Sequence, residues 1–416
     1  MAQEINAGVL PANAILPLNH PEPSVPSSPA TLSPQAVAAG LLAAFVGFAS
    51  SFAVILRGLG AVGASPAQAA SGLMALSIAM GLCAILLSLA TRMPVSIAWS
   101  TPGAALLATS GVPEGGFAAA VGAFLVTGLL IVIAGLWKPL GRMVVRIPAP
   151  LANAMLAGVL LGLCLAPVRA VASLPHLALP VVIVWAVVAK FRRLYAVPAA
   201  VLVAAILIAV FVKGAPLESG LLWPRPVLAA PVFSLSAIVG IALPLFIVTM
   251  ASQNIPGMAV LHVNGYRPEP GRLFATTGIF SLLCAPFGGH AVNLAAITAA
   301  LCAGPDAHPD PGRRYWAAVA AGVTYVLFGL LAGAATALIS ASPPVLIEAV
   351  AGLALLGAFG SALLNAVSDP ADREAAVITF LVAASGLTFA GISGAFWGLL
   401  AGGAMMALGR WKRTDR

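Results

Sequence analysis

The chain has 416 residues, of which 61% are hydrophobic and 8% charged, with a formal net charge of +8. A soluble domain carries roughly 25% charged residues, so this composition excludes a water-soluble protein and indicates many membrane-spanning segments. The basic residues do not gather on one face with aromatic residues between them, which argues against a nucleic-acid-binding protein.

The first segment is rich in proline. Residues 1–30 contain six prolines and no Lys or Arg. They lack the basic and apolar regions of a signal peptide. We therefore expect residues 1–33 to be a disordered cytoplasmic tail.

Apolar runs interrupted by Pro, Gly and charge predict an all-α membrane protein of fourteen segments. The first seven, in residues 34–213, are 35–58, 66–90, 94–110, 116–137, 148–168, 174–191 and 195–213. After a linker at 214–232, residues 233–410 hold 233–255, 271–285, 287–303, 313–340, 343–366, 373–389 and 392–410.

The distribution of basic residues predicts the orientation. With the N-terminus in the cytoplasm, most of the 20 Lys and Arg residues fall in inner loops, as the positive-inside rule requires. The exceptions are Arg57, Arg169, Lys213 and Arg225. Both termini are therefore expected in the cytoplasm. Seven segments in each half place the second half upside down, which predicts an inverted repeat.

The third segment of each half is expected to be broken into a short extended stretch and a half-helix. In residues 94–111, PVSIAWSTPGAALLATSG, Ser100 or Thr101 can cap a helix whose first turn holds Pro102. In residues 286–304, PFGGHAVNLAAITAALCAG, Asn293 can cap the second half-helix and His290 adds a polar group. Helix starts in mid-membrane leave N–H groups that favour an anion such as a carboxylate. The alternative is a pair of kinked helices packed on their neighbours.

Other polar and aromatic residues extend this candidate substrate site. Gln253 and Asn254 lie in a polar stretch of the eighth segment, where they can contact a substrate or bond neighbouring helices. Ser50 and Phe48 lie in the first segment, and Phe48 with Trp99 can flank a flat ring or serve packing alone.

Two residues are candidates for carrying a proton, because ionisable groups inside a membrane are costly and tend to be functional. Glu348 lies about one turn into the twelfth segment, where it can equally be interfacial. His290 lies in the second break.

Other chemistry is not indicated. The chain has no nucleotide-binding Gly-rich loop and no His, Asp and Glu cluster with metal spacing, so neither a cofactor nor a metal is expected. We also expect no enzyme, because no convergent nucleophile, base or metal set is visible.

Three stretches carry a family resemblance: PVSIAWSTPGAALLATSG, SQNIPG at 252–257, and AGLALLGAFGSAL at 351–363. With them the chain resembles the benzoate–proton symporter family of bacterial inner membranes, related in fold to uracil permeases and sulfate-type anion transporters. The resemblance implies fourteen segments in two inverted repeats of seven. It implies a core domain of about 34–137 plus 233–340, and a gate domain of about 138–213 plus 341–410 that often forms dimers.

The resemblance also implies import of benzoate or a similar aromatic carboxylate with protons, by alternating access. Uracil permeases carry an acidic residue in the eighth segment, where this chain has Gln253 and Asn254. That difference fits an anionic substrate and leaves the proton site open. The alternatives are a transporter or channel of the same fold for another organic anion or a nucleobase.

Overall fold

A computed structural model describes residues 33–137, 139, 148–211, 224–295, 297–340, 343–389 and 392–414. The predicted tail, apart from Ser33, and residues 214–223 of the predicted linker lie outside the described residues. The described chain is mostly helical. Among these residues, seven helices are long and apolar enough to cross a membrane, by length and composition. The full count of fourteen segments stays a prediction.

The first half of the chain begins with a helix that is broken into α1 and α2. Its elements are α1 (Pro34–Ala49), α2 (Phe52–Ala61), α3 (Pro66–Thr91), β1 (Ile97–Trp99), α4 (Thr101–Ser110), α5 (Gly116–Leu136), α7 (Ala149–Cys164), α8 (Ala166–Ser173), α9 (Pro175–Arg192), the 3-10 turn η1 (Arg193–Tyr195) and α10 (Ala196–Phe211).

The second half begins with a helix that contains two π-helical turns. Its elements are α11 (Leu235–Ala237), the π turn η3 (Ile238–Ala242), α12 (Leu243–Thr249), the π turn η4 (Met250–Asn254), α13 (Ile255–Val263), α14 (Pro270–Cys284), η5 (Ala285–Phe287), β2 (Val292–Leu294), α15 (Ile297–Ala303), η6 (Pro311–Arg313), α16 (Tyr315–Leu330), α17 (Ala332–Ser340), α18 (Pro344–Val367), α19 (Arg373–Ala384), β3 (Thr388–Phe389), β4 (Ile392–Ser393) and α20 (Gly394–Thr414).

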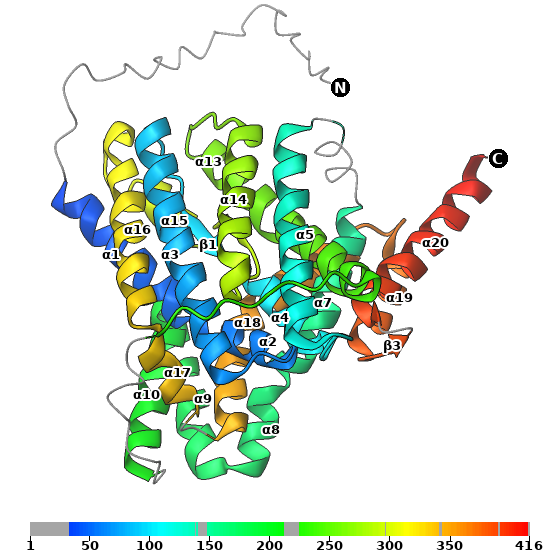
Figure 1. Ribbon diagram of the computed structural model, residues 1–416, viewed down its shortest axis with the longest axis horizontal. Helices are drawn as coiled ribbons and strands as arrows, with labels where there is room; N and C mark the ends of the chain where they lie inside the picture. Colours follow the sequence, from blue (N-terminus) through cyan, green and yellow to red (C-terminus); the bar gives the residue numbers. More distant parts are fainter. Residues whose placement is uncertain are drawn as a thin grey trace, which may run out of the picture.

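Four upright helices, α3, α5, α14 and α16, form one side of the molecule (Figure 1). Helix α16 packs on α3, and α14 packs on α5. The α3–α16 contact is close because Gly81 and Gly322 face each other. A Cβ on either glycine would overlap the carbonyl oxygen of the other. Small residues that let two backbones approach are a common basis of helix packing in membranes.

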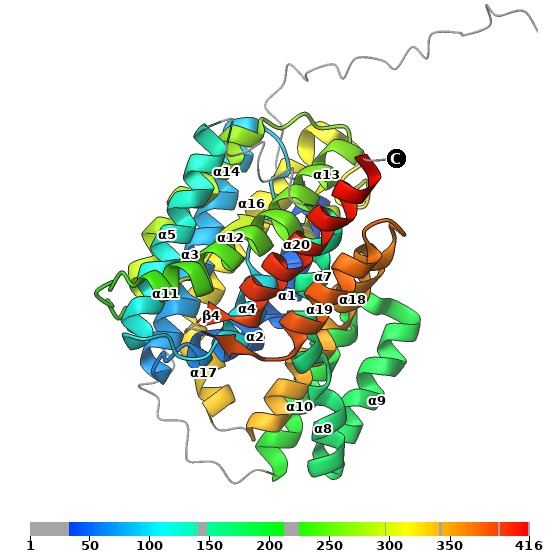
Figure 2. The same cartoon turned by 90° about the vertical axis from the view of Figure 1, so that its right-hand side faces the viewer.

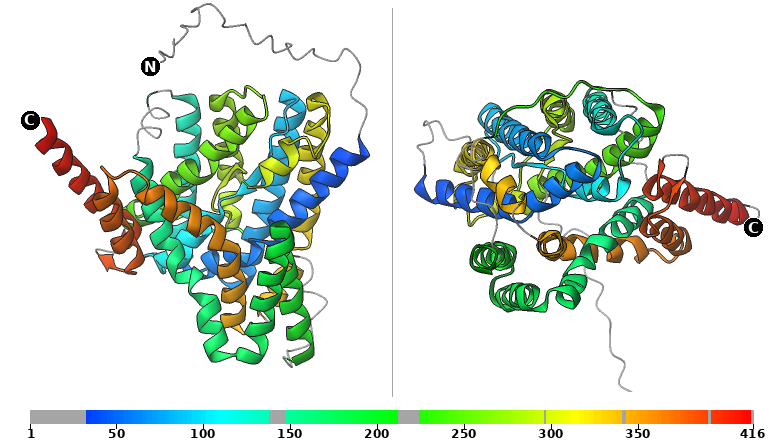
Figure 3. Two further views of the ribbon diagram at one scale, coloured as in Figure 1. Left: turned by 180° about the vertical axis from the view of Figure 1, so that it is seen from behind. Right: turned by 60° about the horizontal axis from the view of Figure 1, so that its bottom comes forward.

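A second group of helices has apolar cores of its own. Buried side chains from α8, α9, α10 and α18 form one cluster, which includes Leu177, Ile208 and Leu346. Leu151, Ala375 and Met406 join α7, α19 and α20 in another cluster. Helices α8, α9 and α10 lie together below and beside the upright helices (Figure 2), and α20 projects away from the body (Figure 3).

The predicted segment at 35–58 is interrupted at Ser50 and Ser51. Both serine hydroxyls donate to the Gly47 carbonyl oxygen, at 3.1 and 2.8 Å, where the helical bond is lost. The predicted eighth segment is interrupted by a π turn at Met250–Asn254, just before Pro256 and Gly257.

The described part of the linker has no helix or strand from residue 224 to 234 and runs across the upright helices (Figure 1). Backbone bonds hold it there. Val232 N–H donates to Ala118 of α5, and Ala229 N–H donates to Pro286 of η5. Val227 N–H donates to the Ser71 hydroxyl of α3. The linker therefore joins the upright helices as well as connecting the two halves.

Candidate functional site

The two predicted breaks lie side by side at the centre of the site. Strands β1 and β2 pair antiparallel, with Ala98 opposite Asn293 and Trp99 opposite Val292. The pairing continues beyond the strands, because Ser100 N–H donates to Ala291 and Ala295 N–H donates to Ser96. The predicted extended stretches and half-helices are therefore present in both segments.

Helix α4 begins as the sequence predicts. Ser100 is its N-cap, and its hydroxyl accepts from Gly103 N–H at 3.1 Å. Pro102 in the first turn has no N–H to satisfy. Ala104 N–H donates to the Ser100 carbonyl oxygen. Within the described residues the Thr101 N–H has no acceptor, so this helix start offers a single free backbone donor.

The prediction that Asn293 caps the second half-helix is wrong. Asn293 lies in β2, and α15 begins at Ile297. The Asn293 amide fits its surroundings when Oδ1 accepts from Ser100 N–H and Nδ2 donates to the Leu294 carbonyl oxygen, both at 2.9 Å. Its side chain is fully buried. A contact across the strands thus replaces the local capping bond.

His290 also contacts the start of α4. Its Nε2 lies 2.9 Å from the Ser100 carbonyl oxygen. A carbonyl oxygen only accepts, so Nε2 carries the hydrogen. The side chain is fully buried, and Nδ1 has no hydrogen-bond partner in the described part of the chain. Phe124 of α5 meets the ring edge-on, with centroids 6.3 Å apart.

Both predicted polar residues of the eighth segment lie in the π turn Met250–Asn254, but their side chains have different surroundings. Asn254 is fully buried; its Oδ1 accepts from Leu294 N–H at 2.9 Å and its Nδ2 contacts the Met250 sulfur. Gln253 lines a cavity instead, and no hydrogen bond engages its amide among the described residues. The neighbouring Thr249 donates to the Ser100 hydroxyl at 2.9 Å.

The cavity has an internal volume of about 60 Å³, and about 480 Å³ when the space open to solvent is counted. Of the predicted substrate residues, Ser50, Trp99, Thr101 and Gln253 line it; Phe48, Ser100, Asn254, His290 and Asn293 do not. The remaining lining residues are Val46, Gly47, Ser51, Met80, Ala98, Ala295, Thr298 and Tyr325. No charged side chain is among the described residues that line it.

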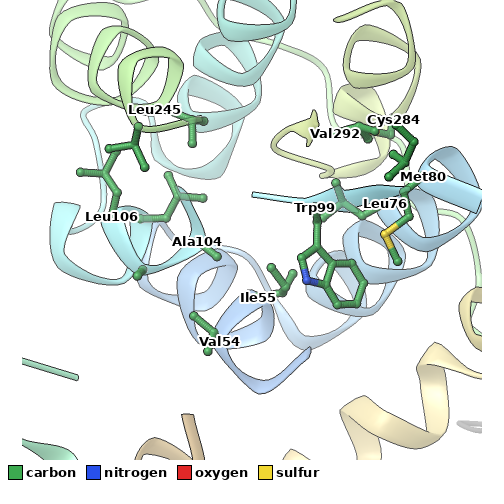
Figure 4. Close-up of a cluster of buried hydrophobic side chains, with 14 of the residues drawn as sticks. Val54, Ile55, Leu76, Met80, Trp99, Ala104, Leu106, Leu245, Cys284 and Val292 are labelled. Atoms are coloured by element: carbon green, nitrogen blue, oxygen red, sulfur yellow. The ribbon is translucent and has the colours of Figure 1, made fainter. Parts of the chain in front are cut away.

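Trp99 forms the aromatic part of the wall. It points from β1 toward α2 and α3 (Figure 4). Its ring N–H donates to the Ser51 hydroxyl at 2.8 Å. Phe48 lies behind it, with ring centroids 5.4 Å apart. Trp99 therefore has a fixed orientation, and Phe48 supports it from outside the cavity.

Two polar residues of the cavity, Thr298 and Tyr325, were not predicted from the sequence. Tyr325 is a tyrosine in the middle of an apolar segment, a signal that could have been used. Thr298 follows directly on the second break, so its position offered the same signal as that of Thr101.

Glu348 lies away from the cavity. Its carboxylate is 2.9 Å from the Arg57 guanidinium, and this ion pair joins α18 to α2. Arg57 is one of the basic residues that the positive-inside rule does not explain, and Glu348 supplies its partner. Among the described residues no group of three His, Cys, Asp or Glu side chains comes together as a metal site.

Solved structures with the same fold are anion transporters. The transmembrane domain of the cyanobacterial bicarbonate transporter BicA matches with a TM-score of 0.57 at 16% identity, over 90% of this chain and 95% of that chain. Murine Slc26a9, an anion transporter in its inward-facing state, matches with a TM-score of 0.59 at 13% identity, over 93% of this chain and 70% of that chain. At these identities the likeness concerns the fold.

Sequence comparison gives closer relatives. The chain is 42% identical over 376 residues to the inner membrane protein YdcO of Escherichia coli, covering 90% of this chain and 95% of that protein. It is 34% identical over 369 residues to the benzoate membrane transport protein of Acinetobacter baylyi, covering 88% and 93%. The sequence profile described as "Benzoate membrane transport protein" matches residues 30–408.

Fold, site and comparisons together define a membrane transport protein. The chain belongs to the benzoate membrane transport protein family. It is an integral protein of a bacterial inner membrane. The family resemblance seen in the sequence is thereby confirmed.

Proposed function

We propose that the protein imports benzoate or a similar aromatic monocarboxylate with protons, by alternating access. One observation carries the proposal. Thr101, whose N–H has no acceptor among the described residues, and Gln253, whose amide has no hydrogen bond there, line the same cavity as Trp99. A carboxylate placed at the start of α4 gains charge-assisted hydrogen bonds there. The ring of the substrate then lies against Trp99, Met80 and Val46.

The name of the Acinetobacter relative supports benzoate as the substrate. The absence of a charged side chain among the described lining residues supports a monoanion. A dianion would leave a second buried charge without a partner, which is costly. A nucleobase lacks the carboxylate that the Thr101 N–H would bind.

We further propose that residues 34–137 with 233–340 form a core that moves against a gate of 138–213 with 341–410. The apolar clusters confined to α8, α9, α10 and α18, and to α7, α19 and α20, support this division, while α7 and α18 also pack on the main apolar core. The exposed apolar side chains of the projecting α20, such as Leu400 and Leu408, suit lipid or a second copy bound to the gate.

The proton carrier is proposed to be His290 or Glu348. His290 has a free, buried Nδ1 next to the start of α4. Glu348 bonds Arg57 across the proposed core and gate, so protonation of its carboxylate would release that contact. Substituting His290→Gln and Glu348→Gln separately distinguishes them, because only loss of the true carrier uncouples uptake from a pH gradient.

The test of the proposed function is uptake of labelled benzoate by purified protein in proteoliposomes. With an acidic exterior, we expect benzoate to accumulate above its external concentration, and a protonophore to abolish the accumulation. Uptake that does not depend on the pH gradient would refute proton coupling. Absence of benzoate uptake by a protein that takes up uracil or bicarbonate would refute the substrate. Channel activity would show as non-saturating flux without accumulation.

A further inference from the structure

The polar groups of the cavity fall on either side of β1 along the chain. Thr101 follows the strand, at the start of α4, and Ser96 precedes it. Thr298 lines the cavity, and its hydroxyl is 3.4 Å from the Ser96 hydroxyl. Gln253 and Tyr325 line the cavity as well. Thr101 therefore marks one end of the cavity, and Thr298 with Tyr325 the second end.

Gly47 makes the second end accessible. A Cβ at Gly47 would overlap the Tyr325 hydroxyl and lie 3.2 Å from the Thr298 methyl group. The glycine thus lets Tyr325 of α16 and Thr298 of α15 reach the cavity wall of α1. Any larger residue at this position would push them out of place.

The Thr298 and Tyr325 hydroxyls interact with each other, and each still has capacity for a further hydrogen bond. The Tyr325 hydroxyl lies 3.5 Å from the Ala43 carbonyl oxygen, and the Thr298–Ser96 distance is 3.4 Å. Both distances are at the outer limit of a hydrogen bond, where the interaction is weak. Hydroxyl groups can donate and accept, so this end suits an uncharged polar group. It offers no cation to a second carboxylate.

We propose that Thr298 and Tyr325 are specificity-determining residues that bind a hydroxyl substituent on the ring of the substrate. This inference rests on the proposed function, in which the carboxylate occupies the Thr101–Gln253 end. A 3- or 4-hydroxybenzoate carries its two polar groups on different edges of one flat ring, as the two ends of the cavity require. Terephthalate, with a second carboxylate, is excluded.

The experiment compares inhibition of labelled benzoate uptake in proteoliposomes by benzoate, 3- and 4-hydroxybenzoate, and terephthalate. Variants Tyr325→Phe and Thr298→Val remove one hydroxyl each with little change in shape. Tyr195→Phe and Thr276→Val are matched controls, because neither residue lines the cavity; Tyr195 is exposed, and the Thr276 hydroxyl donates to Arg272 within α14.

For the parent protein, we expect a hydroxybenzoate to inhibit at least as well as benzoate and terephthalate to inhibit weakly. Tyr325→Phe and Thr298→Val should each weaken hydroxybenzoate inhibition about three- to tenfold, as loss of a neutral hydrogen bond does. Inhibition by benzoate should weaken less than inhibition by the hydroxybenzoate, and the two control variants should change neither. Equal weakening for both acids, or none, would overturn the assignment.

A second readout separates this inference from the proposed transport. Thermal stabilisation of the purified protein by each acid measures binding without uptake. If benzoate binds but is not taken up, the proposed transport fails while the hydroxyl selectivity can still be measured. If both variants keep the parent's preference for hydroxybenzoate over benzoate, the assignment of Thr298 and Tyr325 fails, while the proposed transport of benzoate is unaffected. If neither acid binds the parent, both fail.

Discussion

The two half-elements β1–α4 and β2–α15 have similar sequence patterns but different contacts. In the first, Ser100 caps its own helix and Thr101 faces the cavity with its N–H free. In the second, His290 and Asn293 both turn toward Ser100, one to its carbonyl oxygen and one to its amide. Within the described residues the first half-element therefore presents the free polar groups, and the second holds it in position.

This difference shows that a repeated pattern need not imply a repeated role. Asn254 of the π turn has a role similar to that of Asn293, because its Oδ1 accepts a hydrogen bond from the Leu294 N–H of β2. The buried amides satisfy backbone groups at a strand–helix junction that lies away from water. Unsatisfied groups there would be costly. The predictions below separate binding residues from supporting residues.

The largest effect is expected for the binding side. Thr101→Val and Gln253→Leu should each raise the apparent KM for benzoate roughly 10- to 100-fold, because a hydrogen bond to a charged group contributes about 1.5–3 kcal/mol. Thr109→Val is the control, since its hydroxyl bonds within α4 to Leu106. Uptake kinetics in proteoliposomes measure the change. A KM unchanged in both variants would place the carboxylate elsewhere.

The next effect tests the supporting side. Asn293→Ala leaves the Leu294 carbonyl oxygen without its side-chain donor and leaves Ser100 N–H with only its bond to Ala291, which should destabilise the fold by about 1–3 kcal/mol. The midpoint of thermal unfolding in detergent should fall, while benzoate affinity of the folded protein stays close to that of the parent. Asn264→Ala, which removes one bond to Val260 at the end of α13, is the control. A large loss of affinity at unchanged stability would make Asn293 a substrate ligand.

A smaller effect is expected at His290. The Ser100 carbonyl oxygen also accepts from Ala104 N–H at 2.8 Å, so it keeps a partner when the ring is replaced. His290→Gln should therefore lower stability by about 1 kcal/mol, measured by the same unfolding experiment. A loss of stability as large as that caused by Asn293→Ala would show that the His290 ring has a role beyond its hydrogen bond to the Ser100 carbonyl oxygen.

The smallest effect is expected outside both half-elements. The Arg57 and Glu348 side chains are 47% and 28% exposed, and pairs of this kind contribute about 0–1 kcal/mol. Arg57→Glu should change uptake only a few fold, and the exchanged pair Arg57→Glu with Glu348→Arg should restore it. If the exchange fails to restore uptake, the two residues act independently.

Local signals predicted the start of α4, because capping by Ser100 and the placement of Pro102 depend on residues next to one another in the chain. The pairing of β1 with β2 joins residues about two hundred positions apart, and no local rule indicates their register. Asn293 shows the consequence, because its side chain accepts from Ser100 N–H across the paired strands instead of capping a helix. Trp99, Thr101 and Gln253 were predicted because a polar or aromatic residue at a break in an apolar segment is unusual.

The most direct test of the account is protection of Thr101→Cys by benzoate. The native cysteines Cys83, Cys164, Cys284 and Cys302 are buried, and replacing them by Ala gives a clean background. A membrane-permeant maleimide should modify the new thiol, and benzoate should slow the reaction in a saturable manner. A modification rate that does not change with benzoate would contradict the claim that the start of α4 holds the carboxylate.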